Sequence, residues 1–183
     1  MHTLIENKHV LINALLFQVL WFVAILAQDT WSLIPLVLML AHFLLIANKH
    51  LLAVLSLAFL GILIDSAFNF AGIYHFSVVS HTLPYLNLPV WLASLWLGFC
   101  LSLPISLAWL LKKPHFLVVV CSLMGPVSYL AGRRLGALSF ADANIWLLVL
   151  EWCIFSIIAL IVLFPKLGVG TASPIFSKKK CLC

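Results

Sequence analysis

The sequence has very few charged residues for its length. Only 8% of its 183 residues are charged, whereas 65% are apolar. A soluble globular domain is typically about half apolar and about a quarter charged, because its surface must face water. So few charges cannot cover a water-facing surface. The composition therefore excludes an ordinary soluble domain and predicts a protein of the membrane.

The sequence also lacks the common motifs of enzymes and metal sites. It has no glycine-rich phosphate loop, no G-x-S-x-G elbow and no H-E-x-x-H motif. Its histidines do not form the clusters typical of membrane di-iron enzymes, and its five cysteines lack zinc spacing. Three cysteines fall in apolar runs and two in the tail, which does not indicate a disulfide framework. We therefore expect no cofactor and no metal, and an enzyme is not favoured.

Long apolar runs account for most of the chain. A transmembrane helix needs about 20 predominantly apolar residues. Six runs approach this length, at about 10–27, 31–48, 51–73, 88–111, 116–138 and 145–164. They predict an all-α, polytopic bundle of six transmembrane helices. The short connections indicate one transmembrane domain over residues 1–183, which ends in a basic cytoplasmic tail at 165–183.

The lysines predict the orientation of this bundle. With six crossings, one side of the membrane holds Lys8, Lys49, Lys112, Lys113, Lys166, Lys178, Lys179 and Lys180. Positive charge favours the cytoplasmic side, so both termini are expected in the cytoplasm of a bacterial inner (plasma) membrane. Lysines that flank apolar runs do not indicate nucleic-acid binding. Amphipathic rings favour the interface, and the predicted outer ends carry Trp31, Tyr74, Tyr85, Trp91 and Trp146.

Arg133 and Arg134 are the exceptions to the charge rule, because they fall on the outer side. Asp65 and Glu151 lie within the third and sixth runs, at a similar outer depth. Ionisable groups inside a membrane are costly, at about 2.5–3.5 kcal/mol each, and usually mark functional positions. We therefore expect Arg133 to pair with Asp65 or Glu151, because arginine can bind a carboxylate in bidentate fashion. The alternatives are purely structural contacts of the carboxylates and arginines that reach lipid headgroups.

Polar residues with helical spacing extend this candidate site. Asn69 follows Asp65 by four residues, and Tyr129 precedes Arg133 by four. The candidate ligand-binding residues are Asp65, Asn69, Tyr129, Arg133, Arg134 and Glu151. Small and polar residues also recur on the fourth run, where they are typical of close helix packing. Gln18 on the first run is expected to be a buried amide between helices.

Four segments carry a resemblance to a known family. They are NALLFQVLWF at 13–22, DSAFNFAG at 65–72, PVWLASLWLGF at 89–99 and GPVSYLAGRRLGA at 125–137. Together they resemble a bacterial integral-membrane family known as domain of unknown function 2878, over nearly the whole chain. The resemblance implies a membrane protein with a connection to lipids, and it supplies no catalytic residues.

These observations favour a protein that binds or translocates an anionic or amphipathic, lipid-like ligand at an outward-facing polar cavity. Its expected partners are membrane lipids, a lipid or small anionic ligand, and a membrane protein, with no nucleic acid. One alternative is a membrane-embedded lipid-modifying enzyme with Asp65 or Glu151 as the general base. Another is a structural subunit of a membrane complex, which predicts an exposed face of small residues and no enclosed pocket.

Overall fold

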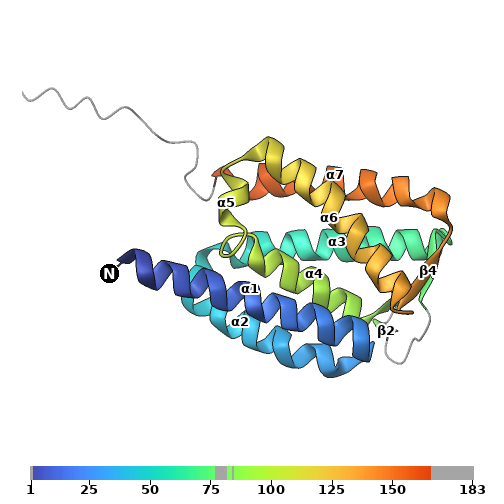
Figure 1. The fold of residues 1–183 in the computed structure, drawn as a ribbon, viewed down its shortest axis with the longest axis horizontal. Helices are drawn as coiled ribbons and strands as arrows, with labels where there is room; N and C mark the ends of the chain where they lie inside the picture. Colours follow the sequence, from blue (N-terminus) through green and yellow to red (C-terminus); the bar gives the residue numbers. More distant parts are fainter. Residues whose placement is uncertain (1, 77–81, 84, 166–183) are drawn as a thin grey trace, which may run out of the picture.

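The computed structural model describes residues 2–76, 82–83 and 85–165, and it is mostly α-helical, which confirms the all-α prediction. The helices lie side by side along the long axis, and successive long helices run in opposite directions (Figure 1). The predicted tail lies outside the described residues from residue 166 onward. The helices are α1 (His2–Ala27), α2 (Leu33–Ala47), α3 (Leu51–Phe70), α4 (Val90–Ser102), α5 (Ala108–Leu111), α6 (Pro114–Arg134) and α7 (Ile145–Leu163).

Four described stretches are long and apolar enough to cross a membrane. They are Asn7–Ala27, Thr30–Phe70, Pro114–Arg134 and Asp142–Leu163. The second of these contains both α2 and α3, which are joined by the 3-10 turn η2 (Asn48–His50). Large apolar side chains cover the surface: Leu45 is 83% exposed and Leu52 is 78% exposed. Since water disfavours such a surface, the chain is a membrane protein.

The fourth apolar run is broken into two helices. The sequence predicted one helix over 88–111, with a bend at Pro104. Instead, α4 ends at Ser102, a turn follows, and α5 begins at Ala108. Proline lacks a backbone N–H and clashes with the preceding helical turn, so the helix cannot continue through Pro104. The backbone N–H of Leu107 donates to the carbonyl of Ser102 at 2.9 Å, which closes the turn.

Two helices each end in a glycine turn of the same type, and both turns lead into strands that pair with each other. Gly72 after α3 and Gly136 after α6 have φ of 70° and 77°. In each turn the glycine N–H and the next N–H bond back to the last helical turn, as in a Schellman motif. The strands β1 (Tyr74–Phe76) and β4 (Leu138–Phe140) then pair antiparallel. The sequence predicted helix up to 138 here, and the glycine turn explains the earlier end.

The remaining short elements lie between the helices. A second antiparallel pair joins β2 (Thr82–Leu83) to β3 (Leu88–Pro89). The 3-10 turns η1 (Thr30–Ser32) and η3 (Asp142–Asn144) precede α2 and α7. The Asp29 carboxylate accepts from the N–H of Thr30 at 2.6 Å and so caps η1.

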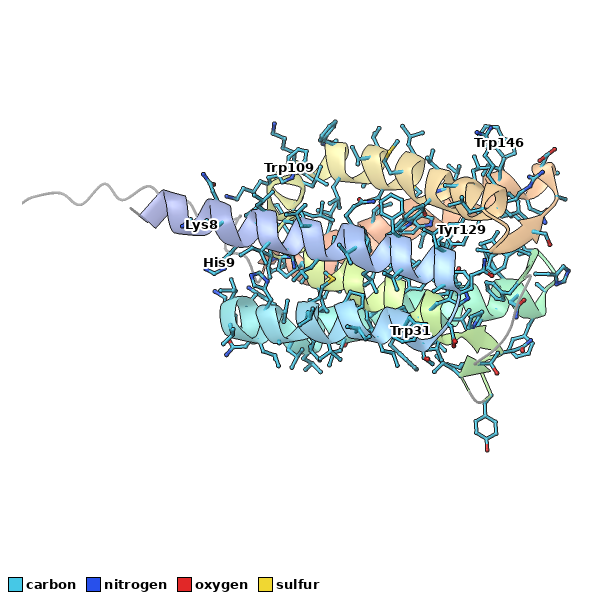
Figure 2. The ribbon with its side chains drawn as sticks, turned by 60° about the horizontal axis from the view of Figure 1, so that its bottom comes forward. Lys8, His9, Trp31, Trp109, Tyr129 and Trp146 are labelled. Carbon is cyan, nitrogen blue, oxygen red and sulfur yellow. The ribbon has the colours of Figure 1, made fainter. Side chains whose placement is uncertain are left out.

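The predicted outer aromatic belt is only partly present. Trp31 and Trp146 are 63% and 73% exposed, and both lie toward the end of the bundle away from Lys8 (Figure 2). Tyr85 is also exposed. The prediction was wrong for Tyr74 and Trp91, which are buried. The turn after α3 folds β1 back over the helix ends, so these two rings pack inside the protein.

Two stacked indole rings lie at the centre of the bundle. Trp96 of α4 and Trp152 of α7 stack with ring centroids 5.1 Å apart and an interplanar angle of 14°. Gly61 of α3 lies against the outer face of Trp96, and Gly125 of α6 lies against Trp152. A Cβ atom at either glycine would overlap the facing indole. The stack therefore sets how closely α3, α4, α7 and α6 approach one another.

We expect Gly125→Ala to lower the free energy of unfolding by about 1–3 kcal/mol, because the added methyl group overpacks the Trp152 ring. Gly132→Ala on the same helix is the matched control, since its Cβ would meet only ordinary contacts at 3.5 Å or more. Thermal unfolding of both variants in one detergent checks this. Equal unfolding temperatures for the two variants would show that the indole contact does not limit the packing.

Candidate functional site

The carboxylate of Asp65 lies at the centre of a buried polar cluster. Asp65 is completely buried on α3. The Tyr74 hydroxyl donates to its Oδ1 at 2.5 Å, and the Trp96 indole N–H donates to its Oδ2 at 2.5 Å. The Tyr129 hydroxyl lies 2.8 Å from Oδ1 and 2.7 Å from Oδ2. Three neutral donors thus satisfy this carboxylate, which lowers the cost of holding its charge away from water.

The glycine turns explain how the three donors reach one carboxylate. Gly72 reverses the chain after α3, so that Tyr74 on β1 lies over the helix that carries Asp65. The pairing of β1 with β4 holds this strand beside the end of α6, which carries Tyr129. Trp96 comes from α4, and Gly61 on the neighbouring helix α3 leaves room for its ring. Local turn chemistry and helix packing therefore build the cluster together.

Tyr74 stays a hydrogen-bond donor in this setting. Burial, followed by the charge of Asp65, raises the pKa of Tyr74 well above its usual range. A raised pKa keeps the proton on the hydroxyl, so Tyr74 donates to Asp65 rather than repelling it. Its ring also packs against Tyr129, with centroids 5.9 Å apart.

Glu151 is the second buried carboxyl group of the cluster. It lies on α7 and is 3% exposed. Its side chain is within hydrogen-bonding reach of Asp65. Neither of its oxygens receives a hydrogen bond from a described donor. The cluster therefore contains two carboxyl groups in contact, but donors for only one of them.

A cavity of about 510 Å³ lies next to this cluster. Its wall is mostly apolar and comes from α1, α4, α5, α6 and α7. Trp96 and Tyr129 line this cavity and also bond to Asp65, so they lie between the cavity and that carboxylate. Gln18, Met124 and Val127 line the cavity and are also exposed at the surface. The cavity therefore opens between α1 and α6, on the flank of the bundle.

The structure brings together only some of the candidate residues that the sequence suggested. Asp65, Tyr129 and Glu151 are in one cluster, whereas Asn69 donates instead to the carbonyl of Asn87 at 2.8 Å. Of the six candidates, Tyr129 alone lines the cavity.

The predicted ion pair of Arg133 with Asp65 or Glu151 is wrong. Arg133 pairs with Asp142 at 2.5 Å, and its guanidinium lies over the Phe140 ring at 5.1 Å. The turn at Gly136 brings β4 and η3 back beside the end of α6. The carboxylate of Asp142 on η3 therefore lies beside Arg133 and pairs with it. Arg134 is exposed at the same helix end.

Sequence reasoning missed three residues of the site. Tyr74 was assigned to the outer interface, and Trp96 was not singled out within the fourth run. Buried tyrosine and tryptophan usually need a partner for their polar atoms, and this requirement could have linked both to a buried carboxylate. Gln18 was expected to be buried between helices, but it is exposed at the cavity.

The described residues contain no group of three or more side chains that could hold a metal ion. The polar cluster is instead suited to hydrogen bonding and to binding protons.

The chain matches the model of the family described as "Protein of unknown function (DUF2878)" over residues 10–161. Since the match covers most of the chain, the protein belongs to this family. No curated protein and no solved structure matches it. The family description names no activity, so the chemistry must be argued from the site itself.

We expect Tyr129→Phe to lower the free energy of unfolding by about 1.5–3 kcal/mol, the typical loss for a hydrogen bond to a charged group. The ring and its packing remain, so the change isolates the hydroxyl. Tyr85→Phe is the control, because that side chain is fully exposed and its hydroxyl faces no core. Denaturant unfolding in detergent, followed by tryptophan fluorescence, measures both variants. A Tyr129→Phe protein as stable as the control would show that the bond to Asp65 contributes little.

Proposed function

We propose that this DUF2878 protein binds an amphipathic, lipid-like molecule and that the ligand enters its cavity from the membrane. The observation that carries the proposal is the apolar cavity of about 510 Å³, which opens between two lipid-facing helices. Its size lies in the range of about 300–1,000 Å³ that is typical of ligand pockets. An apolar chain would be transferred from one apolar solvent to another, so entry from the flank costs little desolvation.

A few polar groups give this cavity the means to select a ligand. No described residue hydrogen-bonds the amide of Gln18, which faces the cavity near the middle of α1. The Ser128 hydroxyl also lies in the wall. A bare amide at this depth is costly unless a partner satisfies it. A hydroxyl, carbonyl or carboxyl group on the ligand fits this position.

Arg134 supports a ligand with an anionic end. It is exposed at the end of α6, one turn beyond Ala131 in the cavity wall. A ligand whose chain lies in the cavity can place its headgroup beside this arginine. The proposal therefore keeps the anionic, lipid-like ligand, but the cavity is apolar rather than lined by the six candidate polar residues.

The arrangement of α4 favours ligand binding over a purely structural role. A structural subunit is expected to expose a face of small residues. On α4 such a stripe is formed by Ser94, Gly98 and Ser102, and all three are buried inside this chain. The Ser106 hydroxyl beyond it bonds to Asn13 of α1 at 2.6 Å.

We expect the protein, extracted with its own lipids, to retain a bound lipid in native mass spectrometry. Met124→Trp should remove that lipid, because the larger side chain fills the mouth of the cavity. Leu123→Trp is the matched control, since Leu123 is similarly exposed on α6 but does not line the cavity. Equal lipid retention in the two variants, or none in the unsubstituted protein, would contradict the proposal.

We also propose six crossings of a bacterial inner membrane, with both termini in the cytoplasm. α1 begins and α7 ends at the same end of the bundle, which supports an even number of crossings (Figure 1). Lys8 lies near that end (Figure 2). Lys49, between α2 and α3, and Lys112, before α6, fall at the same end by helix order. The positive-inside rule then places this end in the cytoplasm.

Fusions of alkaline phosphatase test this orientation, because the enzyme is active only outside the cytoplasm. A fusion after Ala141 should be active, and one after Pro165 should be inactive. A green fluorescent protein fused after Pro165 should fluoresce, which controls for expression. The reverse pattern of activity would overturn the proposed orientation.

A further inference from the structure

Asp65 and Glu151 form a contact that needs a proton. Both side chains are buried, and they lie within hydrogen-bonding reach of each other. Ionised carboxylates only accept hydrogen bonds, so two of them cannot bond to one another. Among the described residues, neither carboxyl forms an ion pair with a lysine or arginine. Two adjacent negative charges without a cation would repel strongly in this setting, and a shared proton removes that repulsion.

The surrounding donors indicate which carboxyl is charged. The groups that face Asp65 are Tyr74 from β1, Trp96 from α4, Tyr129 from α6 and Glu151 from α7. The first three donate to Asp65 and stabilise its anion. Glu151 has no described donor for either oxygen. The proton is therefore best placed on Glu151, from where it can donate to Asp65.

Tyr129 connects this pair with the cavity. Its hydroxyl bonds to Asp65, and its side chain is part of the cavity wall. A hydroxyl group can accept a proton on one side while it gives its own to a partner on the other. A proton from the cavity would thus form a new O–H bond on Tyr129 as the old Tyr129 proton moves to Asp65. The tyrosine ends unchanged and the pair gains one proton.

We propose that Asp65 and Glu151 are a proton-binding site inside the membrane bundle, with the resting proton on Glu151 and Tyr129 as its link to the cavity. This goes beyond ligand binding, because the site takes up and releases protons whether or not a lipid is bound. When the cavity holds a ligand with an acidic hydroxyl or carboxyl group, the same relay can accept its proton.

Infrared spectroscopy of the lipid-depleted protein in nanodiscs tests the pair directly. We expect one protonated-carboxyl C=O band at neutral pH. Labelling glutamate with carboxyl-¹³C should shift this band, whereas labelling aspartate should not, and neither label disturbs the fold. Glu151→Gln should remove the band, and Asp142→Asn, at an exposed carboxylate, should leave it unchanged. The absence of a band at neutral pH, or a band that shifts with labelled aspartate, would overturn the assignment.

Exchange into D₂O tests the route through Tyr129, because deuteration shifts the same band. We expect Tyr129→Phe to slow this exchange by about tenfold or more, since removal of a relay group in proton transfer typically has effects of this size or larger. Tyr74→Phe is the matched variant, because it also removes a hydroxyl bonded to Asp65 but does not line the cavity. If Tyr74→Phe slows the exchange and Tyr129→Phe does not, the route through the cavity is overturned.

Both experiments use protein without added ligand, so their outcome is separate from that of the lipid-binding test. A missing carboxyl band would reject the proton site and leave lipid binding in place. If no lipid is retained but the carboxyl band is present, lipid binding is rejected and the proton site is kept. Near-ultraviolet circular dichroism of the stacked Trp96 and Trp152 rings shows whether each variant keeps its fold.

Discussion

A single buried carboxylate imposes the main constraint on this bundle. Asp65 is completely buried, so its charge must be met by donors from the protein. The donors come from β1, α4 and α6, and a second carboxyl group comes from α7. Satisfying one side chain of α3 therefore fixes the positions of four other elements. Loss of any one donor leaves a charged group partly unsatisfied in an apolar interior, which is far costlier than loss of an ordinary contact.

Packing and polar bonding support one another at this centre. The Trp96 ring stacks on Trp152 with one face, lies against Gly61 with the other, and donates its N–H to Asp65. The apolar part of the ring thus holds the helices at a set distance, while its polar edge meets the carboxylate. Transmembrane helices gain little from hydrophobic burial, because lipid is as apolar as the core. Close packing at glycines and buried hydrogen bonds must therefore provide much of the specificity.

The sequence was sufficient to predict the all-α class and the family, because hydropathy and short sequence segments depend on local composition. It did not predict which cation or donor meets each carboxylate. That choice depends on the turns at Gly72 and Gly136, which carry Tyr74 toward Asp65 and Asp142 toward Arg133. A glycine with positive φ is hard to distinguish by sequence from a glycine inside a helix. The orientation of Gln18 was missed for a similar reason, because a cavity arises only when several helices pack together.

The relation between the polar cluster and the cavity limits what the protein can do. An open polar cavity would admit water and screen the carboxyl pair, whereas an apolar cavity keeps their local dielectric low. Tyr129 and Trp96 line the cavity and also bond to Asp65 through their polar atoms, so both side chains lie between the two regions. Only a hydroxyl can pass a proton across this wall, because an indole N–H is a donor without an acceptor lone pair. If a ligand in the cavity exchanges protons with the carboxyl pair through this wall, the transfer must therefore pass through Tyr129.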